Sequence, residues 1–282
     1  MEDLDTATRL ERTSDSTFTT ALSPAWEIWG PNGGYLAAVA LRAAGVQMQR
    51  ARPVSLTAHF VGAGASRSAE IAVTINRATK VATSATVTIT QDERPLLVAV
   101  VWGSDDGLPG LTHHTSSRPQ DVPPPESLRT VAELTADIDG ARPHPFWDNV
   151  EERPTSWIAD WESRSAAEPE RQSWYRFVPT ATFSDPWVDA ARSLILIDLD
   201  SWPAATMAHL GELDHYAPTV ELNARFAGSA AEEPWLLSRA AAPVATDGLI
   251  AATGEIWSPS GRLLALGGST LLCRPAARRP DR

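Results

Sequence analysis

The sequence has one cysteine, few basic residues and no long hydrophobic run, and each shortage excludes a class of protein. Cys273 stands alone, which rules out an intramolecular disulfide framework, and the first residues lack the basic and apolar segments of a signal peptide. No apolar stretch reaches the roughly 20 residues that a membrane-spanning helix needs. We therefore expect a soluble, cytoplasmic protein with no membrane partner.

Positive charge is also scarce. The 24 Lys and Arg residues are outnumbered by 35 Asp and Glu residues, which gives a net charge of −11. Such a balance leaves no broad basic face, so we expect no nucleic-acid partner. The sequence lacks a Gly-x-Ser-x-Gly elbow, a glycine-rich phosphate loop and a compact set of His and Cys ligands. We therefore predict no metal site and no cofactor.

The clearest positive signal is an internal repeat. The segments after Pro53 and after Pro218 both alternate apolar and polar residues, the pattern of a half-buried strand. The apolar positions have the same residue types, with numbers larger by 166 in the second copy: Val54, Leu56, Ala58, Phe60 and Gly62 match Val220, Leu222, Ala224, Phe226 and Gly228. The polar positions differ. This pattern predicts one scaffold used twice, with chemistry on one copy or shared between both.

Three more strands are predicted after each repeated strand. They lie at 69–77, 81–90 and 95–102 in the first half, and at 234–241, 249–257 and 262–272 in the second. Turn-forming residues at 91–95 and 258–261 predict hairpins between the last two strands of each half. Each half is therefore predicted to be an antiparallel meander.

The helices and the middle of the chain complete the predicted organisation. Residues 35–44 should form a helix that is apolar on nearly every side, and such a helix needs to be enclosed. The corresponding stretch of the second half is 203–211, after a helix over 186–198 that Asp185 caps. Proline-rich residues 104–172 read as a connection that contains a short helix near 126–138.

These elements predict an α+β fold of the double hot-dog type, in which two fused repeats each wrap a curved antiparallel sheet around a central helix. The expected domains are an N-terminal hot-dog domain at 1–110, a linker rich in Pro and Trp at 111–172, and a C-terminal hot-dog domain at 173–282. We expect homo-oligomers, because a single fused pair leaves apolar sheet surface that further copies would cover.

Three motifs carry a resemblance to a known family. They are Trp29-Gly-Pro-Asn-Gly-Gly-Tyr-Leu-Ala-Ala38, the strand Pro218–Phe226, and Ser260-Gly-Arg-Leu-Leu-Ala-Leu266 with Arg274 beyond it. With the two meanders, they make the chain resemble the acyl-CoA thioesterase II-like, double hot-dog proteins. The resemblance covers nearly the whole chain outside 104–172. It implies hydrolysis of an acyl-CoA to free acid and CoA, without a metal or organic cofactor.

The resemblance also implies three catalytic positions in the second half. Family members use an Asp, a Thr and a Gln to position and activate the attacking water. In this sequence the aspartate position falls on Glu221, the threonine position near Pro243 and the glutamine position on Ser269. A carboxylate is retained at the first position, while proline offers no hydroxyl at the second.

The start of the first helix is the candidate oxyanion site. Free backbone N–H groups at Asn32-Gly33-Gly34 would polarise a thioester carbonyl, and the glycines would let the substrate approach closely. We assign Asn32 and Gly34 to catalysis and Gly33 to substrate binding. The alternative is that Asn32 only caps the helix and the glycines form a tight turn.

The remaining candidates lie on predicted strands. Glu221 beside Asn223 would direct water as a general base, or would be a solvated residue paired with Arg225. Ser269 and Thr270 would hold the water or the substrate through their hydroxyl groups, or would be ordinary strand residues. His59 would be an acid or base near the groove, or would only be held by hydrogen bonds.

Three functions follow from these candidates. The first is hydrolysis of an acyl-CoA or carrier-bound acyl thioester, with Glu221 directing the water and Ser269 or Asn223 assisting. The second is a hot-dog dehydratase or tailoring enzyme that uses His59 with Glu221. The third is a catalytically silent acyl-binding protein. Several tryptophans near the linker either line an acyl tunnel or seal the linker onto the sheets: Trp147, Trp157, Trp161, Trp174 and Trp187.

Overall fold

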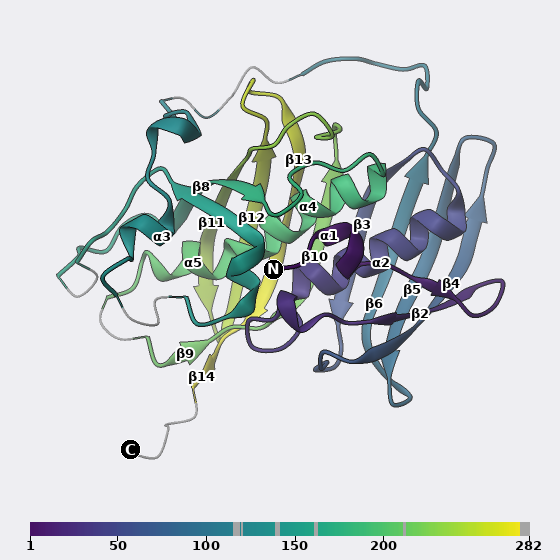
Figure 1. Ribbon diagram of the computed structural model, residues 1–282, viewed down its shortest axis with the longest axis horizontal. Coiled ribbons are helices and arrows are strands. Elements are labelled where there is room, and N and C mark those ends of the chain that lie inside the picture. The colour runs from purple at the N-terminus through teal and green to yellow at the C-terminus, as the bar shows by residue number, and fades with distance from the viewer. Residues whose placement is uncertain (115–118, 120, 139–141, 161–162, 211–212, 277–282) are drawn as a thin grey trace.

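The computed structural model describes residues 1–282 except 115–118, 120, 139–141, 161–162, 211–212 and 277–282. A single twelve-stranded antiparallel sheet runs through both halves of the chain, and the long helices lie against one of its faces (Figure 1). The order of the strands in this sheet is β1-β2-β4-β5-β6-β3-β10-β13-β12-β11-β8-β7. The two halves therefore form one continuous layer, with the helices as the second layer.

The first half wraps six strands around one helix, α2 (Gly33–Met48). The strands of this half are β1 (Glu11–Arg12), β2 (Thr17–Ala21), β3 (Arg52–Phe60), β4 (Ser68–Ala78), β5 (Ala82–Gln91) and β6 (Arg94–Ser104). A short helix, α1 (Leu4–Ala7), precedes them. The strands and the helix predicted for this half are confirmed to within a few residues.

In the second half the strands follow the same order outward from the seam between β3 and β10, so that β8-β11-β12-β13-β10 corresponds to β2-β4-β5-β6-β3. Its elements are β8 (Glu170–Phe177), α4 (Pro186–Leu199), α5 (Ser201–Thr206), β9 (His215–Tyr216), β10 (Thr219–Phe226), β11 (Leu236–Thr246), β12 (Leu249–Trp257), β13 (Leu263–Leu272) and β14 (Arg274–Pro275). Strands β9 and β14 form a separate two-stranded sheet. The predicted double hot-dog arrangement is confirmed.

The two repeated strands, β3 and β10, pair with each other and join the halves. Ala58 lies opposite Leu222 and Leu56 lies opposite Ala224, and all four side chains are buried beneath the helices. Side chains alternate between the faces of a strand, so the residues between them point to the outer face of the sheet. The repeated apolar pattern is therefore the inner surface of the seam.

Helix α2 is enclosed because almost every side of it is apolar. Tyr35 through Leu41 are each at most 4% exposed. Asn32 caps the helix by accepting a hydrogen bond from the Tyr35 N–H at 3.0 Å, and Gln49 ends it in the left-handed conformation at φ 52°. The helix starts and stops where its sequence provides the caps.

The central helix of the second half is α4, and the prediction that 203–211 corresponds to α2 was wrong. Residues 194–197 of α4 are buried to within 1% and pack against α2. The stretch that begins at Pro203 forms only the end of the shorter α5. The run Leu194-Ile-Leu-Ile197 buries far more apolar surface than the alanine-rich stretch can, which decides which helix takes the centre.

The connection between the halves contains more structure than predicted in some places and less in others. The predicted helix near 126–138 is replaced by two shorter elements, the 3₁₀ turn Pro125–Ser127 and the helix α3 (Val131–Leu134). A capping box between Thr130 and Glu133 starts α3. A second 3₁₀ turn, Pro145–Asn149, leads into β7 (Val150–Pro154), which pairs with β8 at the end of the sheet.

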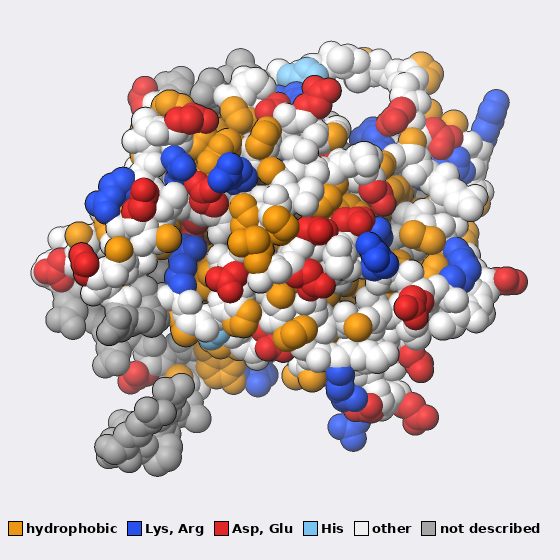
Figure 2. Space-filling model, viewed as in Figure 1, with side chains coloured by type: hydrophobic (Ala, Val, Ile, Leu, Met, Phe, Trp, Pro, Cys, Tyr) orange, Lys and Arg blue, Asp and Glu red, His pale blue; other side chains and the backbone are white. Residues whose placement is uncertain are grey.

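The surface fits the acidic composition. Across the face seen in Figure 2, Asp and Glu side chains are interspersed with Lys and Arg side chains. No helix in the described part of the chain is long and apolar enough to traverse a bilayer.

Candidate functional site

A cavity of about 390 Å³ lies where the start of α2 meets the end of α4. One side is formed by Asn32 and Gly33 at the start of α2, and the other by Asp198 and Leu199 at the end of α4. Aromatic side chains line much of the rest: Trp29, Phe60, Trp147 and Trp202. The cavity is therefore mostly apolar, with a small set of polar groups where the two helices meet, as in many small-molecule sites.

Asp198 is the polar centre of this cavity. Although only 7% of the residue is exposed, its carboxylate lies at the cavity wall. Its Oδ2 accepts a hydrogen bond from the Gly34 N–H at 2.8 Å and a longer one from the Asn32 side-chain amide at 3.5 Å. The carboxylate also lies at the positive end of the α2 dipole, which favours its charged form.

Burial raises the pKa of Asp198 above its ordinary value, while its hydrogen bonds from Thr219, Gly34 and Asn32 lower it. Burial is the stronger effect. The result is a carboxylate more basic than a solvated aspartate, held in a fixed orientation beside an apolar cavity, and these are the properties of a general base.

Thr219 completes the Asp198 site through a bulge in β10. Its hydroxyl donates a hydrogen bond to Asp198 Oδ1 at 2.7 Å. The pairing of β10 with β13 shifts between Thr219 and Glu221, so one extra residue separates them. A bulge re-aims the side chains on one side of it. The shift lets Thr219 face the helices, although strict alternation from the buried Leu222 would turn it outward.

Of the expected helix-start residues, Asn32 and Gly33 line this cavity, and the hydrogen bonds at the helix start differ from those that the sequence suggested. The Gly34 N–H is already bound to Asp198, and the Tyr35 N–H to Asn32. The Gly33 N–H has no hydrogen-bond acceptor among the described residues, and Gly33 lines the cavity. A Cβ on Gly33 would lie 3.0 Å from Asp198 Oδ2, so a side chain there would crowd the carboxylate.

Ser269 lies on the inner face of the sheet, behind the cavity. It is 3% exposed, and its hydroxyl donates to the Ser201 hydroxyl at 2.7 Å. Ser201 in turn donates to the carbonyl oxygen of Ile197. Ser269 therefore fixes the junction of α4 and α5, which carries Asp198, and its own side chain lies outside the cavity lining.

The other predicted residues lie together on the opposite face of the sheet. Glu221 lies directly across from His59 on β3 and from Thr270 on β13. The Asn223 side-chain amide donates to Glu221 Oε1 at 3.0 Å. Because Leu222 between them points toward the helices, these four side chains point away from the cavity. The structure thus brings together Asn32, Gly33 and Gly34, and separates them from the Glu221 group.

The sequence-based site missed Asp198 and Thr219. A signal for Asp198 was present, because a carboxylate directly follows the apolar run Leu194-Ile-Leu-Ile197, and a charged residue in a helix destined for the core needs a specific reason. The sequence-based prediction did not use this signal, because it assigned the central helix of the second half to 203–211 and not to 186–198. Thr219 could not be found from alternation, because the bulge reverses its direction.

The matching position at the other end of the helix pair is filled. A Cβ at Gly45 of α2 would lie 2.4 Å from the ring of Trp187 at the start of α4, so the indole packs directly on that glycine. Its Nε1 donates to the carbonyl oxygen of Arg50 at 3.0 Å. The helix pair therefore has a different structure at each end: one end opens to the cavity, and the indole of Trp187 closes the other.

The tryptophans near the linker divide between the two predicted roles. Trp147 lines the cavity, and Trp187 closes the other end of the α2–α4 pair. Trp174 is buried and donates to the carbonyl oxygen of Pro123 at 2.9 Å, which seals the proline-rich segment onto the sheet. Trp157 is 40% exposed, and Trp161 lies outside the described residues.

Comparison with known proteins gives two family matches. Residues 22–104 match the acyl-CoA thioesterase N-terminal domain, and residues 119–270 match the acyl-CoA thioesterase C-terminal domain. Among curated proteins, none matches the chain in sequence.

Solved structures share the whole fold. A putative thioesterase II from Thermobifida fusca has a TM-score of 0.81 at 22% identity, covering 97% of this chain and 98% of its own. A protein of unknown function with a hot-dog fold from Alicyclobacillus acidocaldarius has a TM-score of 0.80 at 21% identity, with the same coverage. An acyl-CoA thioesterase II from Mycobacterium marinum has a TM-score of 0.77 at 18% identity, covering 98% of this chain and 100% of its own.

Proposed function

The chain belongs to the acyl-CoA thioesterase family, and from that premise we propose that it hydrolyses acyl thioesters with a water molecule directed by Asp198. One observation carries the proposal: a buried carboxylate with a raised pKa lies at the wall of an apolar cavity, beside the Gly33 N–H at the start of a helix. The cavity offers an apolar environment for an acyl chain, and its polar corner offers the groups that hydrolysis requires.

The chemistry is the addition of water to the thioester carbon. Asp198 accepts a proton as the water oxygen bonds to that carbon, and the carbonyl oxygen takes on negative charge. The Gly33 N–H and the positive end of the α2 dipole stabilise this oxyanion. The carbon–sulfur bond then breaks, Asp198 returns its proton to the sulfur, and a carboxylic acid and a free thiol leave. No cofactor is needed for these steps.

Thr219 and Asn32 orient the Asp198 carboxylate in this proposal. Their hydrogen bonds reach different carboxylate oxygens, Thr219 to Oδ1 and Asn32 to Oδ2, so the plane of the carboxylate is fixed. An aspartate and a threonine in the second half are two of the three residue types that the family resemblance implies. We therefore assign to Asp198 the water-directing role that the sequence placed on Glu221, and to Thr219 the role that it placed near Pro243.

The two other hypotheses have less support from the geometry. A dehydratase that uses His59 with Glu221 requires a substrate on the outer face of the sheet, where His59 is exposed. A silent binder requires the cavity without turnover. The proposed chemistry is the same for a CoA thioester and for a carrier-bound thioester.

The test is release of free thiol from acyl-CoAs of several chain lengths, measured with a thiol reagent. Asp198→Asn keeps the shape of the side chain and removes the base, so we expect kcat to fall by about 10²–10⁴-fold. Glu221→Gln is the matched control on the outer face and should retain the wild-type rate. Loss of turnover in Glu221→Gln with a normal rate in Asp198→Asn would reverse the assignment, and acyl-CoA binding without thiol release by the wild type would favour the silent binder.

A further inference from the structure

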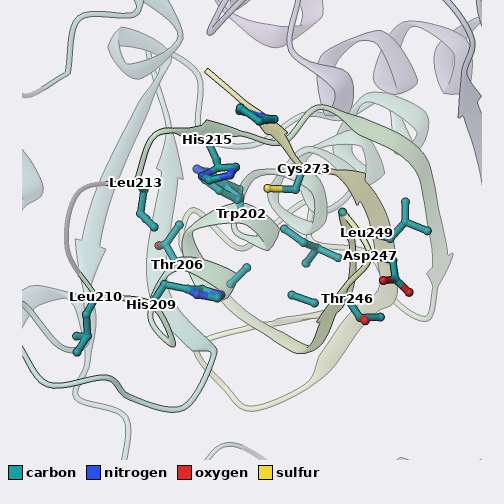
Figure 3. A pocket seen from close by; sticks show the side chains of 15 residues that line it. Trp202, Thr206, His209, Leu210, Leu213, His215, Thr246, Asp247, Leu249 and Cys273 are labelled. Atoms are coloured by element: carbon teal, nitrogen blue, oxygen red, sulfur yellow. The ribbon is translucent and has the colours of Figure 1, made fainter. Parts of the chain in front are cut away.

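A second cavity, of about 580 Å³, lies in the C-terminal half next to the first. It is lined by residues of α5, the β11–β12 turn and the end of β13, among them Thr206, Thr246 and Cys273 (Figure 3). In the view of Figure 3, Trp202 lies on the same side of this cavity as His215 and Cys273, while Asp247 and Leu210 lie at opposite edges.

Among the residues that the structure describes, Trp202 is the one that lines both cavities. Its indole packs on a small buried cluster rich in alanine, whose members contribute to both sides. Ala217 and Leu271 of this cluster face the first cavity, and Ala205 and Ile250 face the second. The partition between the cavities thus consists of one large ring and a set of small side chains around it.

The partition lies close to the proposed base. Trp202 follows Asp198 by four residues, and Asp200 between α4 and α5 keeps right-handed helical angles, so the two side chains are about one helical turn apart. Side chains at this spacing are neighbours, with roughly 5–6 Å between their Cβ atoms. A substrate carbonyl beside Asp198 would therefore have the indole within a few atoms of its acyl carbon.

The lining of the first cavity includes both exposed and buried residues, and this difference orients a thioester. Trp29 in this lining is 62% exposed, while Ala217 and Leu271 are buried. CoA and a carrier-bound thiol are large and charged and have to extend into solvent. The acyl chain then points toward the buried lining residues of the cluster that packs against Trp202.

We propose that the indole of Trp202 is the end wall of the acyl pocket and restricts the enzyme to short acyl chains, while the 580 Å³ cavity behind it is an unused extension of the same pocket. This inference rests on the proposed function, which supplies the orientation of the thioester. Removing the ring joins the cavities, and a longer chain gains apolar contacts for each methylene that enters the second one.

The test compares kcat/KM for butanoyl-CoA and dodecanoyl-CoA. In Trp202→Ala the ratio of dodecanoyl to butanoyl kcat/KM should rise by at least about tenfold over the wild type. Trp202→Leu should raise this ratio less than Trp202→Ala does. It also provides the test if the alanine variant does not fold. Trp157→Ala, which removes a partly exposed indole outside both cavity linings, is the matched control and should leave the ratio unchanged.

A blocking substitution tests whether the chain enters the second cavity. Ala245 lines that cavity and is exposed, so Ala245→Phe in the Trp202→Ala background should return the ratio toward the wild-type value. An unchanged ratio in folded Trp202→Ala and Trp202→Leu would overturn the inference. So would a raised ratio that Ala245→Phe does not lower, because the chain would then leave by another route.

A binding measurement separates this inference from the proposed function. If the wild type hydrolyses neither substrate, the proposed function fails, and the affinity for a non-hydrolysable dodecanoyl-CoA thioether is measured by calorimetry in the same variants. Trp202→Ala should then bind the thioether at least about tenfold more tightly than the wild type does. Equal affinity would overturn the partition as well.

Discussion

The Gly34 N–H of the first half donates a hydrogen bond to the Asp198 carboxylate of the second half, at 2.8 Å. The contact is possible because α2 and α4 approach closely: a Cβ on Gly34 would lie 2.7 Å from the Cα of Ile195. The proposed base therefore depends on a glycine that has no part in the reaction itself. Fusion of the two repeats in one chain provides a site that neither half contains alone.

Gly34→Ala should reduce both stability and activity. The added methyl group would force α2 away from α4, and overpacking of this kind costs about 1–3 kcal/mol, while the gain in helix propensity from glycine to alanine is about 1 kcal/mol or less. We expect a lower free energy of unfolding in urea and a fall in kcat, because the hydrogen bond to Asp198 lengthens. Gly110→Ala is the control, since nothing lies within 4 Å of a Cβ there. Wild-type stability in Gly34→Ala would show that the helices can separate at no cost.

Thr219→Val should move the acid limb of the pH–rate profile to higher pH. Asp198 acts as a base only when ionised, so kcat/KM should rise with pH through its pKa, which burial holds above the ordinary aspartate value. The Thr219 hydroxyl stabilises the ionised form through its 2.7 Å hydrogen bond. Its loss favours the protonated form and raises the pKa further.

Thr219→Ser keeps the hydroxyl and is the matched control for this measurement. Its profile should coincide with that of the wild type within error. If the acid limb of the Thr219→Val profile stays at the wild-type pH and only the maximal kcat/KM falls, a group other than Asp198 is responsible for that limb.

The sheet could be predicted well from the sequence because the alternation of apolar and polar residues along a strand is a local pattern. Period-two alternation placed Leu56 and Ala58 on the inner face of one strand and Leu222 and Ala224 on the inner face of the other, and all four are buried there. The cap at Asn32 was also found from neighbouring residues, since an asparagine before two glycines and an apolar run marks a helix start.

The site was predicted only in part because its geometry is not local. Nothing in the sequence around Asp198 indicates that α4 packs against α2, which decides that the carboxylate meets the start of the other helix. The direction of Thr219 depends on a bulge that no alternating pattern reveals. Glu221 was chosen because the family resemblance placed the catalytic aspartate there, on the polar face of the strand, and the same alternation that buries Leu222 turns it to the outer face.

Asp200→Asn should change how stability depends on pH. Asp200 is 1% exposed and accepts a hydrogen bond from the Tyr175 hydroxyl at 2.7 Å, which an asparagine oxygen can also accept. Burial raises the pKa of Asp200 from 3.8 to about 6, although Arg171 nearby opposes this. A group whose pKa is higher in the folded state favours folding at low pH, and this contribution is lost as pH rises from about 4 to above 6.

The wild type should therefore lose stability relative to Asp200→Asn over that pH range, by about 3 kcal/mol at 1.36 kcal/mol per pKa unit. The measurement is the free energy of unfolding of both proteins in urea at several pH values from 3.5 to 7.5, on the order of one point per half unit. Asp137→Asn, at an exposed position, should follow the wild type throughout. A constant difference between the wild type and Asp200→Asn would mean that Arg171 fully compensates the buried charge, so that Asp200 is ionised in the folded protein at no cost.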